Sequence, residues 1–268
     1  MPSFLNYRDV DFKIDSKDFY ATSLSLSAQA SVDPVLLSDG SLLDYAPSSA
    51  VIGSLSCEFY LTGALPEFLN ITGSHDSAME VKFADVELAN VYAKSISFSV
   101  EPFQPILISA EFDWYGDVKV EDFKEQNAAK RKEKQTPEYV ANALRSSISE
   151  TNSEFIDRSF DRVVSFSYSA SCDRPVFFNA DEKLPFRVAK INKKCDLNLS
   201  SNNLGKLVSI DGKRVQAEIE LKDFYGESLN TFIVSGVLMN QNYNVSNNNY
   251  MLAEAAVMQD VQELKTFV

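Results

Sequence analysis

The chain has 268 residues, which is enough for one large domain or two small domains that each bury a core. Its formal net charge of −13 argues against a protein that holds nucleic acid through clustered Lys and Arg, and its hydrophobic content of 45% argues against a disordered chain. Nineteen Phe and eleven Tyr favour β structure, because flat rings pack well on a pleated surface.

Cysteine usage and the first residues predict synthesis in a reducing cytoplasm. The three cysteines, Cys57, Cys172 and Cys195, have no CxxC spacing and predict neither a disulfide framework nor a zinc site. Residues 1–8 lack the basic start and apolar segment of a secretion signal. No apolar run reaches the length of a membrane span, so we expect no membrane partner.

The first half of the chain is predicted to be a series of strands. Residues 9–14 and 20–32 alternate apolar and polar side chains, with a turn expected at 16–18. Further elements are expected as strands at 51–61, 81–83, 86–88, 93–100 and 106–115, a turn at 39–41 and a short helix at 66–69. Strands at this spacing, with little helix between them, predict a sandwich or a barrel.

Residues 120–158 differ from the rest of the chain. Their basic run is interpreted as a solvated surface and not as a nucleic-acid site. Thr136 is a favourable helix cap and Pro137 suits the first helical position. An apolar stripe with helical spacing follows at Val140, Leu144 and Ile148. We therefore expect an interdomain connector that contains a docked helix.

The second half is again predicted to be rich in strands. They are expected at 163–171, 176–178, 186–199, 215–221 and 232–239. Asp211-Gly212 is a hairpin signal before the fourth of these strands. Residues 240–249 are rich in Asn and predict a loop with one embedded strand, while 253–264 fits either a strand or a terminal helix.

Short signals of the first half recur in the second. Ser23-Leu24-Ser25-Leu26-Ser27 precedes an Asp-Pro-Val run, and Ser165-Phe166-Ser167-Tyr168-Ser169 precedes an Arg-Pro-Val run. Cys57 and Cys195 each precede an acidic residue, which predicts equivalent buried strand positions. We expect a mainly β protein with two similar antiparallel β-sandwich or barrel domains in tandem. Their predicted bounds are 1–119 and 159–268, with the partly helical connector at 120–158.

No group of residues predicts catalysis, a cofactor or a metal. The single histidine, His75, lies between Ser74 and Asp76, but a catalytic triad is assembled by folding and not by sequence adjacency. Four carboxylates that lack EF-hand spacing are interpreted as solvated: Asp39, Asp44, Asp113 and Asp117. Walker and GxGxxG nucleotide patterns are absent. Paired carboxylates for glycoside chemistry stay open, because the fold sets their geometry.

The alternating segment 23–32, the run Asp33-Pro34-Val35-Leu36 and segment 54–61, with their counterparts in the second half, resemble the tail-tube and related tail proteins of tailed bacteriophages. Segments 93–100 and 106–115 fit the same pattern. The resemblance implies β-sandwich or barrel domains whose inner strands join between subunits into a ring around a channel. It also implies that chains with two fused domains form trimers with pseudo-sixfold symmetry, through which DNA passes without being gripped.

We therefore expect a non-enzymatic virion structural protein of the phage tail, either the tube or a neck or baseplate ring. It would be made in the host cytoplasm and assemble with itself and with other tail proteins. Segments 23–32 and 165–171 contain no Lys, Arg, Asp or Glu, and we expect their strand edges to join subunits. The alternative is a carbohydrate-binding or receptor-binding β-sandwich module, and a third reading is a β-sandwich hydrolase.

Overall fold

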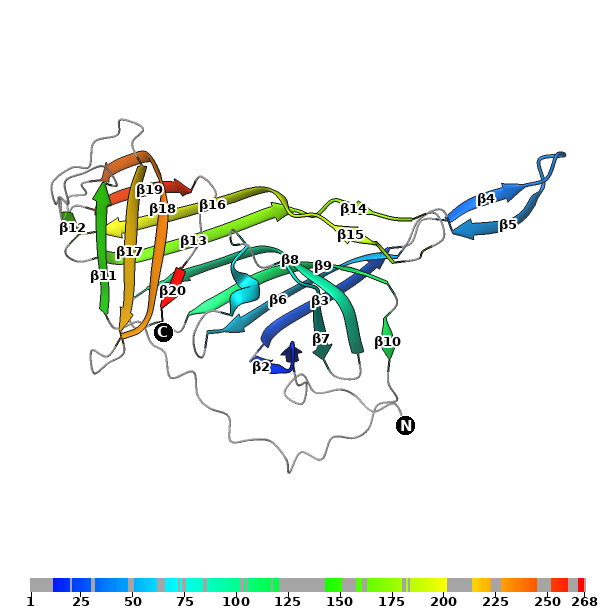
Figure 1. Cartoon of the computed structure of the whole chain (residues 1–268), viewed down its shortest axis with the longest axis horizontal. Coiled ribbons are helices and arrows are strands. Elements are labelled where there is room, and N and C mark those ends of the chain that lie inside the picture. Colours follow the sequence, from blue (N-terminus) through cyan, green and yellow to red (C-terminus); the bar gives the residue numbers. More distant parts are fainter. Residues whose placement is uncertain are drawn as a thin grey trace, which may run out of the picture.

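The computed structural model describes residues 12–19, 21–29, 32–47, 51–61, 66–71, 73, 76–83, 86–101, 104, 106–116, 118–120, 143–150, 158–160, 163–179, 182, 184–201, 214–222, 228–244, 252–259 and 265–267. These residues form antiparallel sheets and one short 3-10 helix, η2 (Glu67–Leu69) (Figure 1). The prediction of a mainly β protein is therefore confirmed, as is the short helical turn after Pro66. Among these residues, no helix is long and apolar enough to cross a membrane.

The strands of the described ranges fall into two sets of ten. The first set is β1 (Phe12–Ile14), β2 (Lys17–Phe19), β3 (Ala21–Gln29), β4 (Val32–Leu36), β5 (Leu42–Pro47), β6 (Ile52–Tyr60), β7 (Met79–Phe83), β8 (Val86–Val100), β9 (Leu107–Tyr115) and β10 (Lys119–Val120). The second set is β11 (Ala143–Glu150), β12 (Arg158–Phe160), β13 (Val163–Asp173), β14 (Val176–Phe177), β15 (Arg187–Val188), β16 (Ile191–Ser201), β17 (Arg214–Lys222), β18 (Ser228–Asn244), β19 (Leu252–Gln259) and β20 (Lys265–Phe267).

Both sets follow the same pairing order. In the first set, neighbouring strands run β2-β1-β7-β8-β9-β6-β3, and β10 also pairs with β8. In the second set they run β12-β11-β17-β18-β19-β16-β13, and β20 also pairs with β18. A separate hairpin, β4–β5 or β14–β15, lies between the third and sixth strands of each set. Each strand thus has a counterpart ten labels later.

Irregularities in the pairing coincide as well. The third strand of each set shifts register against the sixth strand, and the eighth strand shifts against the ninth. These shifts lie at Ala21/Ser23 in β3, Val163/Ser165 in β13, Ala93/Ser95 in β8 and Leu238/Asn240 in β18. Counting residues from the shifts makes Ser27 the counterpart of Ser169, and Ser97 the counterpart of Asn242.

The core of the first set lies between the sheet β8-β9-β6-β3 and a wing formed by β7-β1-β2 (Figure 1). Residues of β6 are buried and exposed in alternation, as expected when one face of a sheet covers a core. The rings of Phe19 and Phe59 meet between the two layers, with centroids 5.0 Å apart. Phe68 of η2 packs against Phe112 of β9, so the helical turn covers part of this core.

Strand β8 belongs to both layers because it is long and bends. Its first residues pair with β7 and β10, and its later residues pair with β9 and β13. Asn90 has φ 55 and lies beside a shift in the β7 pairing. Asparagine adopts this left-handed conformation more readily than most residues, which suits it to the bend.

The two sets share one sheet through an internal joint, formed by residues 95–100 of β8 and 166–171 of β13. The ring of Phe98 lies 6.0 Å from that of Phe166 and 5.3 Å from that of Tyr168, between centroids. All three side chains are buried and belong to one apolar cluster with residues of β6 and β9. The core is therefore continuous across the joint.

The predicted helix is wrong where the structure describes it. Leu144 and Ile148 lie in β11, which pairs with β17 along its whole length. A spacing of four residues fits one face of a helix and also one face of a strand, so the pattern did not distinguish the two. Thr136, Pro137 and Val140 lie outside the described residues. Ala143–Glu150 therefore belong with the second set and not with the 120–158 connector, while the domain bounds 1–119 and 159–268 stay a prediction.

Three smaller expectations also change. Residues 86–88 and 93–100, expected as separate strands, form the single strand β8. Residues 240–244, part of the segment expected as a loop with one embedded strand, continue β18, and residues 252–259 form a strand, one of the two alternatives left open for 253–264. Cys57 and Cys195 are buried as predicted, but they are not counterparts. Pairing with β3 and β13 aligns Cys57 with Leu199, and Cys195 with Gly53.

Candidate functional site

One face of the shared sheet is polar across both sets of strands. Its residues point away from the core on six neighbouring strands, and most of them are serine. They are Ser25 and Ser27 on β3, Ser54, Ser56 and Glu58 on β6, Ser109, Glu111 and Asp113 on β9, Ser95, Ser97 and Ser99 on β8, Ser167, Ser169 and Ser171 on β13, and Asp196 and Asn198 on β16. The pairing registers align them in rows across the strands. We call this surface the serine face.

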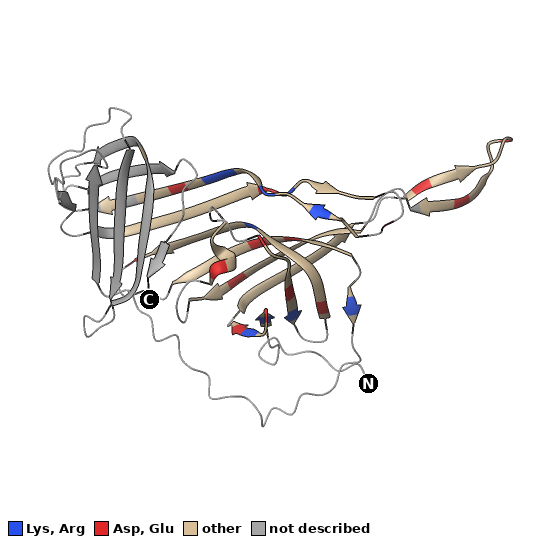
Figure 2. Cartoon of the chain, in the orientation of Figure 1, with Lys and Arg blue, Asp and Glu red and all other residues tan. Residues whose placement is uncertain are grey.

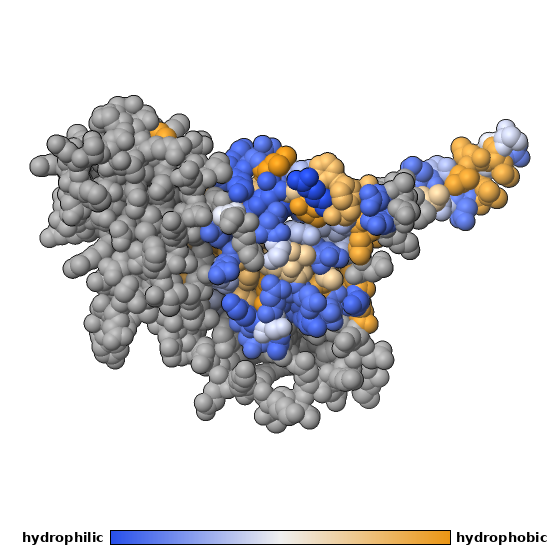
Figure 3. All heavy atoms as spheres, in the orientation of Figure 1, coloured by the Kyte–Doolittle hydropathy of each residue, from blue (hydrophilic) through white to orange (hydrophobic). Residues whose placement is uncertain are grey.

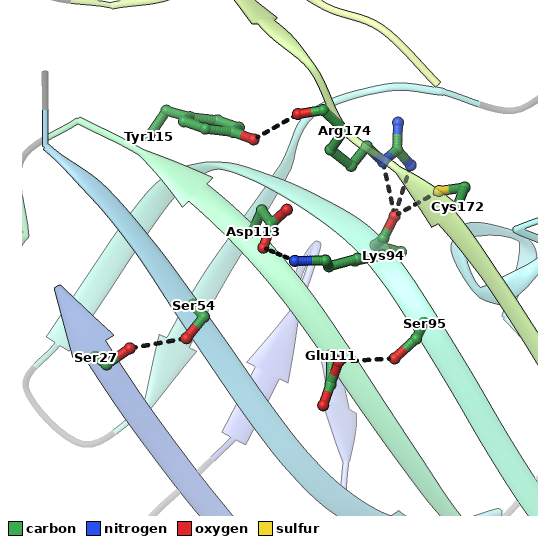
Figure 4. A network of polar contacts seen from close by, with 10 residues as sticks. Ser27, Ser54, Lys94, Ser95, Glu111, Asp113, Tyr115, Cys172 and Arg174 are labelled. Atoms are coloured by element: carbon green, nitrogen blue, oxygen red, sulfur yellow. Dashed lines mark hydrogen bonds and ion pairs between the residues drawn. The ribbon is translucent and has the colours of Figure 1, made fainter. Parts of the chain in front are cut away.

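Short polar contacts link neighbouring strands on the serine face. The Ser27 and Ser54 hydroxyl oxygens lie 2.7 Å apart, and Ser95 donates to Glu111 Oε2 at 3.1 Å (Figure 4). Lys94 Nζ lies 3.2 Å from Asp113 Oδ1, but its side chain is 44% exposed, so this pair adds little stability.

Carboxylates outnumber amines on the serine face, and acidic positions recur along its strands (Figure 2). The charged residues are Glu58, Glu111, Asp113 and Asp196 against Lys94 and Lys194. An acidic surface of this kind repels phosphate groups and does not bind them. The face therefore matches neither a nucleic-acid grip nor a metal cage.

Two edges in the described part of the chain lack the partner that the internal joint gives to their counterparts. Strand β3 pairs only with β6, whereas its counterpart β13 pairs with β16 on one edge and β8 on the other. Residues 240–244 of β18 pair only with β19, whereas their counterparts in β8 pair with both β9 and β13. The expectation that 165–171 forms a free edge is therefore wrong, because β8 covers it. The edges that lack this partner, called the open edges below, are that of β3 and that of residues 240–244.

Side chains on β13 are more buried than their counterparts on β3, because β8 covers β13. Phe166 and Tyr168 on β13 are each 2% exposed, because β8 and Phe98 cover them. Their counterparts on β3, Leu24 and Leu26, are only partly buried. Leu24 and Leu26 thus lie at an uncovered edge, whereas the residues at the same positions of β13 are buried at the internal joint.

The internal joint is also held by a buried arginine, Arg174, which follows β13. Arg174 donates to the Ala93 carbonyl oxygen of β8 from Nε at 2.9 Å and from Nη2 at 2.6 Å (Figure 4). Its guanidinium also forms an ion pair with Asp76 and lies over the Tyr92 ring. The Tyr115 hydroxyl donates to the Arg174 carbonyl oxygen at 3.4 Å. We call this group the Arg174 clasp.

The hairpin β4–β5 extends away from the body of the molecule (Figures 1 and 3). We call it the first arm. It exposes large apolar side chains between 40% and 62% of their area: Val32, Val35, Leu36, Leu37, Leu42, Leu43 and Tyr45. So many exposed apolar residues on one hairpin are unusual for a surface that stays in water.

The counterpart of the first arm, β14–β15, lies against the first set of strands. Leu184, between its two strands, is close enough to Gly116 that a side chain on that glycine would meet it. Lys190 and Lys193, at the base of this hairpin, donate to the Gly73 carbonyl oxygen at 3.1 and 3.2 Å. The β14–β15 hairpin therefore lies against the first set of strands, whereas the first arm follows β3 in the chain and extends away from the body of the molecule.

The carboxylates considered for calcium do not come together. Asp39 accepts hydrogen bonds from Ser41, which hold the pKa of its carboxyl below the usual value. Asp44 accepts a hydrogen bond from the Tyr45 amide on the first arm, and Asp113 of β9 is paired with Lys94 of β8. No group of three or more His, Cys, Asp and Glu that could hold a metal was found where the structure describes the chain. His75 and Asp117 lie outside the described residues, and Asp76 belongs to the Arg174 clasp.

The three cysteines are free thiols in buried surroundings. Burial raises the pKa of Cys57 and of Cys195 to about 12, and nearby Glu58 and Asp196 add to the effect. Burial also raises the pKa of the Cys172 thiol. These thiols stay protonated at neutral pH, which does not suit them to nucleophilic catalysis.

Sequence analysis missed the Arg174 clasp and the first arm. Arg174 was noticed only as part of a repeated Pro-Val segment, and nothing local connects it to Ala93 or Asp76, which are far away in sequence. A cluster of leucines around Asp39-Gly40 was the available signal for the first arm.

No protein-family model matches the chain, and no curated protein matches it either.

Proposed function

We propose that this protein is a non-enzymatic structural subunit that assembles with copies of itself into a ring, as a component of a bacteriophage tail. The observation that carries the proposal is the internal joint, which already links two like sets of strands edge to edge while leaving one edge of each kind open. A subunit with two complementary edges at opposite ends of its sheet associates head to tail, and such contacts close into rings when the rotation fits.

The repeated strand order supports the finer reading that the chain contains two β domains of one kind, derived by duplication. Three chains would then supply six like domains, which agrees with the trimer of pseudo-sixfold symmetry that the resemblance to tail-tube proteins implies. The first arm adds support, because its exposed apolar side chains extend away from the body of the molecule, where a neighbouring chain would cover them.

The serine face supports a channel wall that DNA passes without adhering to it. It is polar and net acidic, and the whole chain has a formal net charge of −13. Phosphates near such a wall are repelled, so DNA is a passing cargo and not a ligand. Other tail proteins are the further partners, and the virion tail is the location.

Light scattering and electron microscopy of the purified full-length chain test this proposal. We expect concentration-dependent assembly and closed rings with a central hole in class averages. A chain that stays monomeric at every concentration refutes the ring. Binding to glycans without assembly would support the carbohydrate-binding module.

A further inference from the structure

We infer that neighbouring chains are joined by the same strand pairing, in the same register, that forms the internal joint. The open edge of β3 in one chain pairs antiparallel with residues 240–244 of β18 in the next chain. This inference rests on the proposed function and specifies the contact residue by residue.

The register follows from the internal joint. There Ser169 lies opposite Ser97, Ala170 opposite Ile96 and Ser171 opposite Ser95. Tyr168 likewise lies opposite Phe98, and Ser167 opposite Ser99. The counterparts of these ten residues, counted from the matching register shifts, give the pairs between chains. The inferred pairs are Ser25 with Asn244, Leu26 with Tyr243, Ser27 with Asn242, Ala28 with Gln241 and Gln29 with Asn240.

The geometry of both edges fits this pairing. At the internal joint, β8 receives β13 on the edge opposite β9. On β18 the same edge is open at the same place, just past a register shift against β19 that has its counterpart in β8. The backbone groups at such an edge need partners, and main-chain pairing with another chain supplies them.

The side chains of β3 fit it as well. Leu26 occupies the position of Tyr168, which lies beside Phe98 at the internal joint. Tyr243 is the counterpart of Phe98 in the strand register, so the inferred pairing places it opposite Leu26. Ser25 and Ser27 would continue the rows of the serine face into the next chain.

Engineered disulfides test the register. Residues directly opposite in an antiparallel pair have Cβ atoms about 4.5–5.5 Å apart, which a small shift brings within disulfide range. We expect Ser27→Cys with Asn242→Cys to give covalently linked oligomers under mild oxidation, with a 27–242 bond mapped by mass spectrometry. The matched control is Ser97→Cys with Ser169→Cys, the same pair at the internal joint, which should give a bond within one chain and no covalent oligomers.

Three variants serve as negative controls. Ser27→Cys with Gln241→Cys places the second thiol on the opposite face of the strand, so we expect at least tenfold less linked product. Ser27→Cys alone and Asn242→Cys alone should form no linked dimers. A dimer from Ser27→Cys alone would mean that β3 pairs with β3 in a two-fold contact, and it would overturn the inference.

Size measurements distinguish a failure of the inferred register from a failure of the proposed ring. If the wild-type chain assembles but the 27–242 bond does not form, while the 97–169 bond does, then the register is wrong and the ring stands. Equal linkage at 241 and 242 likewise refutes the register. If the wild-type chain never assembles, both the inference and the proposed function fail.

Discussion

The Arg174 clasp should make a measurable contribution to the stability of the internal joint. The Arg174 side chain is 3% exposed and donates to Asp76 and to the Ala93 carbonyl oxygen. Arg174→Met removes the charge and the donors but keeps an apolar stem of similar length, so the loss reflects polar contacts more than packing. We expect the first and second sets of strands to be held together less firmly in this variant.

The size of the loss follows from the exposure of the two partners. Removing one partner of a fully buried ion pair costs about 3–5 kcal/mol, whereas an exposed pair contributes about 0–1 kcal/mol. Asp76 is 30% exposed, so water recovers part of its solvation when the arginine is lost. The Ala93 carbonyl loses a charged donor, at about 1.5–3 kcal/mol. Together these give about 2–4 kcal/mol of unfolding free energy.

Urea unfolding can measure this loss, followed by the fluorescence of Trp114, which is the single tryptophan and is fully buried. Protein concentration must be held constant, because the proposed assembly would stabilise the folded chain. Arg187→Met is the matched control, since Arg187 is exposed on β15, and it should change the free energy by less than about 0.5 kcal/mol. Asp76→Asn in the Arg174→Met background should cost much less than in the wild type. A loss below about 0.5 kcal/mol for Arg174→Met would refute the reasoning.

Three further outcomes are expected. Gly53→Ala should destabilise the fold by about 1–3 kcal/mol in the same urea assay, because the new methyl would overlap the Trp114 ring, while Ser56→Ala on the exposed face should have little effect. Iodoacetamide at pH 8 should label none of the three cysteines in the native chain and all three in denaturant, counted by mass spectrometry. The reason is that burial raises the pKa of these thiols and shields them from the reagent. Rapid labelling of Cys57 in the native chain would contradict this. Leu36→Ser with Leu43→Ser should leave the unfolding free energy within about 0.5 kcal/mol but weaken assembly at least tenfold by light scattering; unchanged assembly would exclude the first arm from the contact.

Alternation in sequence predicted most of the strands because each strand covers the core with only one face. Residues 51–61 and 106–115 are clear cases, since they coincide with β6 and β9 to within one residue at each end. The serine runs of β3 and β13 likewise lie in the segments that alternation predicted as strands, 20–32 and 163–171. These features depend on local periodicity, which a sequence displays directly.

Features that depend on pairing partners were not predictable in the same way. The spacing of Leu144 and Ile148 suits a helix or a strand, and only pairing with β17 selects the strand. Cys57 and Cys195 share a local motif, yet strand registers place them at different positions. Asn240 and its neighbours carry loop-forming residues, but pairing with β19 extends β18 through them.

The position of the open edges explains why one contact inside the chain can specify a contact between chains. At the internal joint, the third strand of the second set pairs with the eighth strand of the first set. In a chain of two sets, this leaves the third strand of the first set and the eighth strand of the second set without such a partner. The unused edges are of opposite kinds, so a head-to-tail contact satisfies both, whereas a two-fold contact pairs like with like and cannot reproduce the internal joint. Because β3 carries no charged residue that would discourage pairing, its edge needs a partner more than most exposed strands do. The same reasoning predicts that capping the β3 edge alone should block assembly at both ends of the sheet, since every contact of the proposed kind would use one edge of each kind.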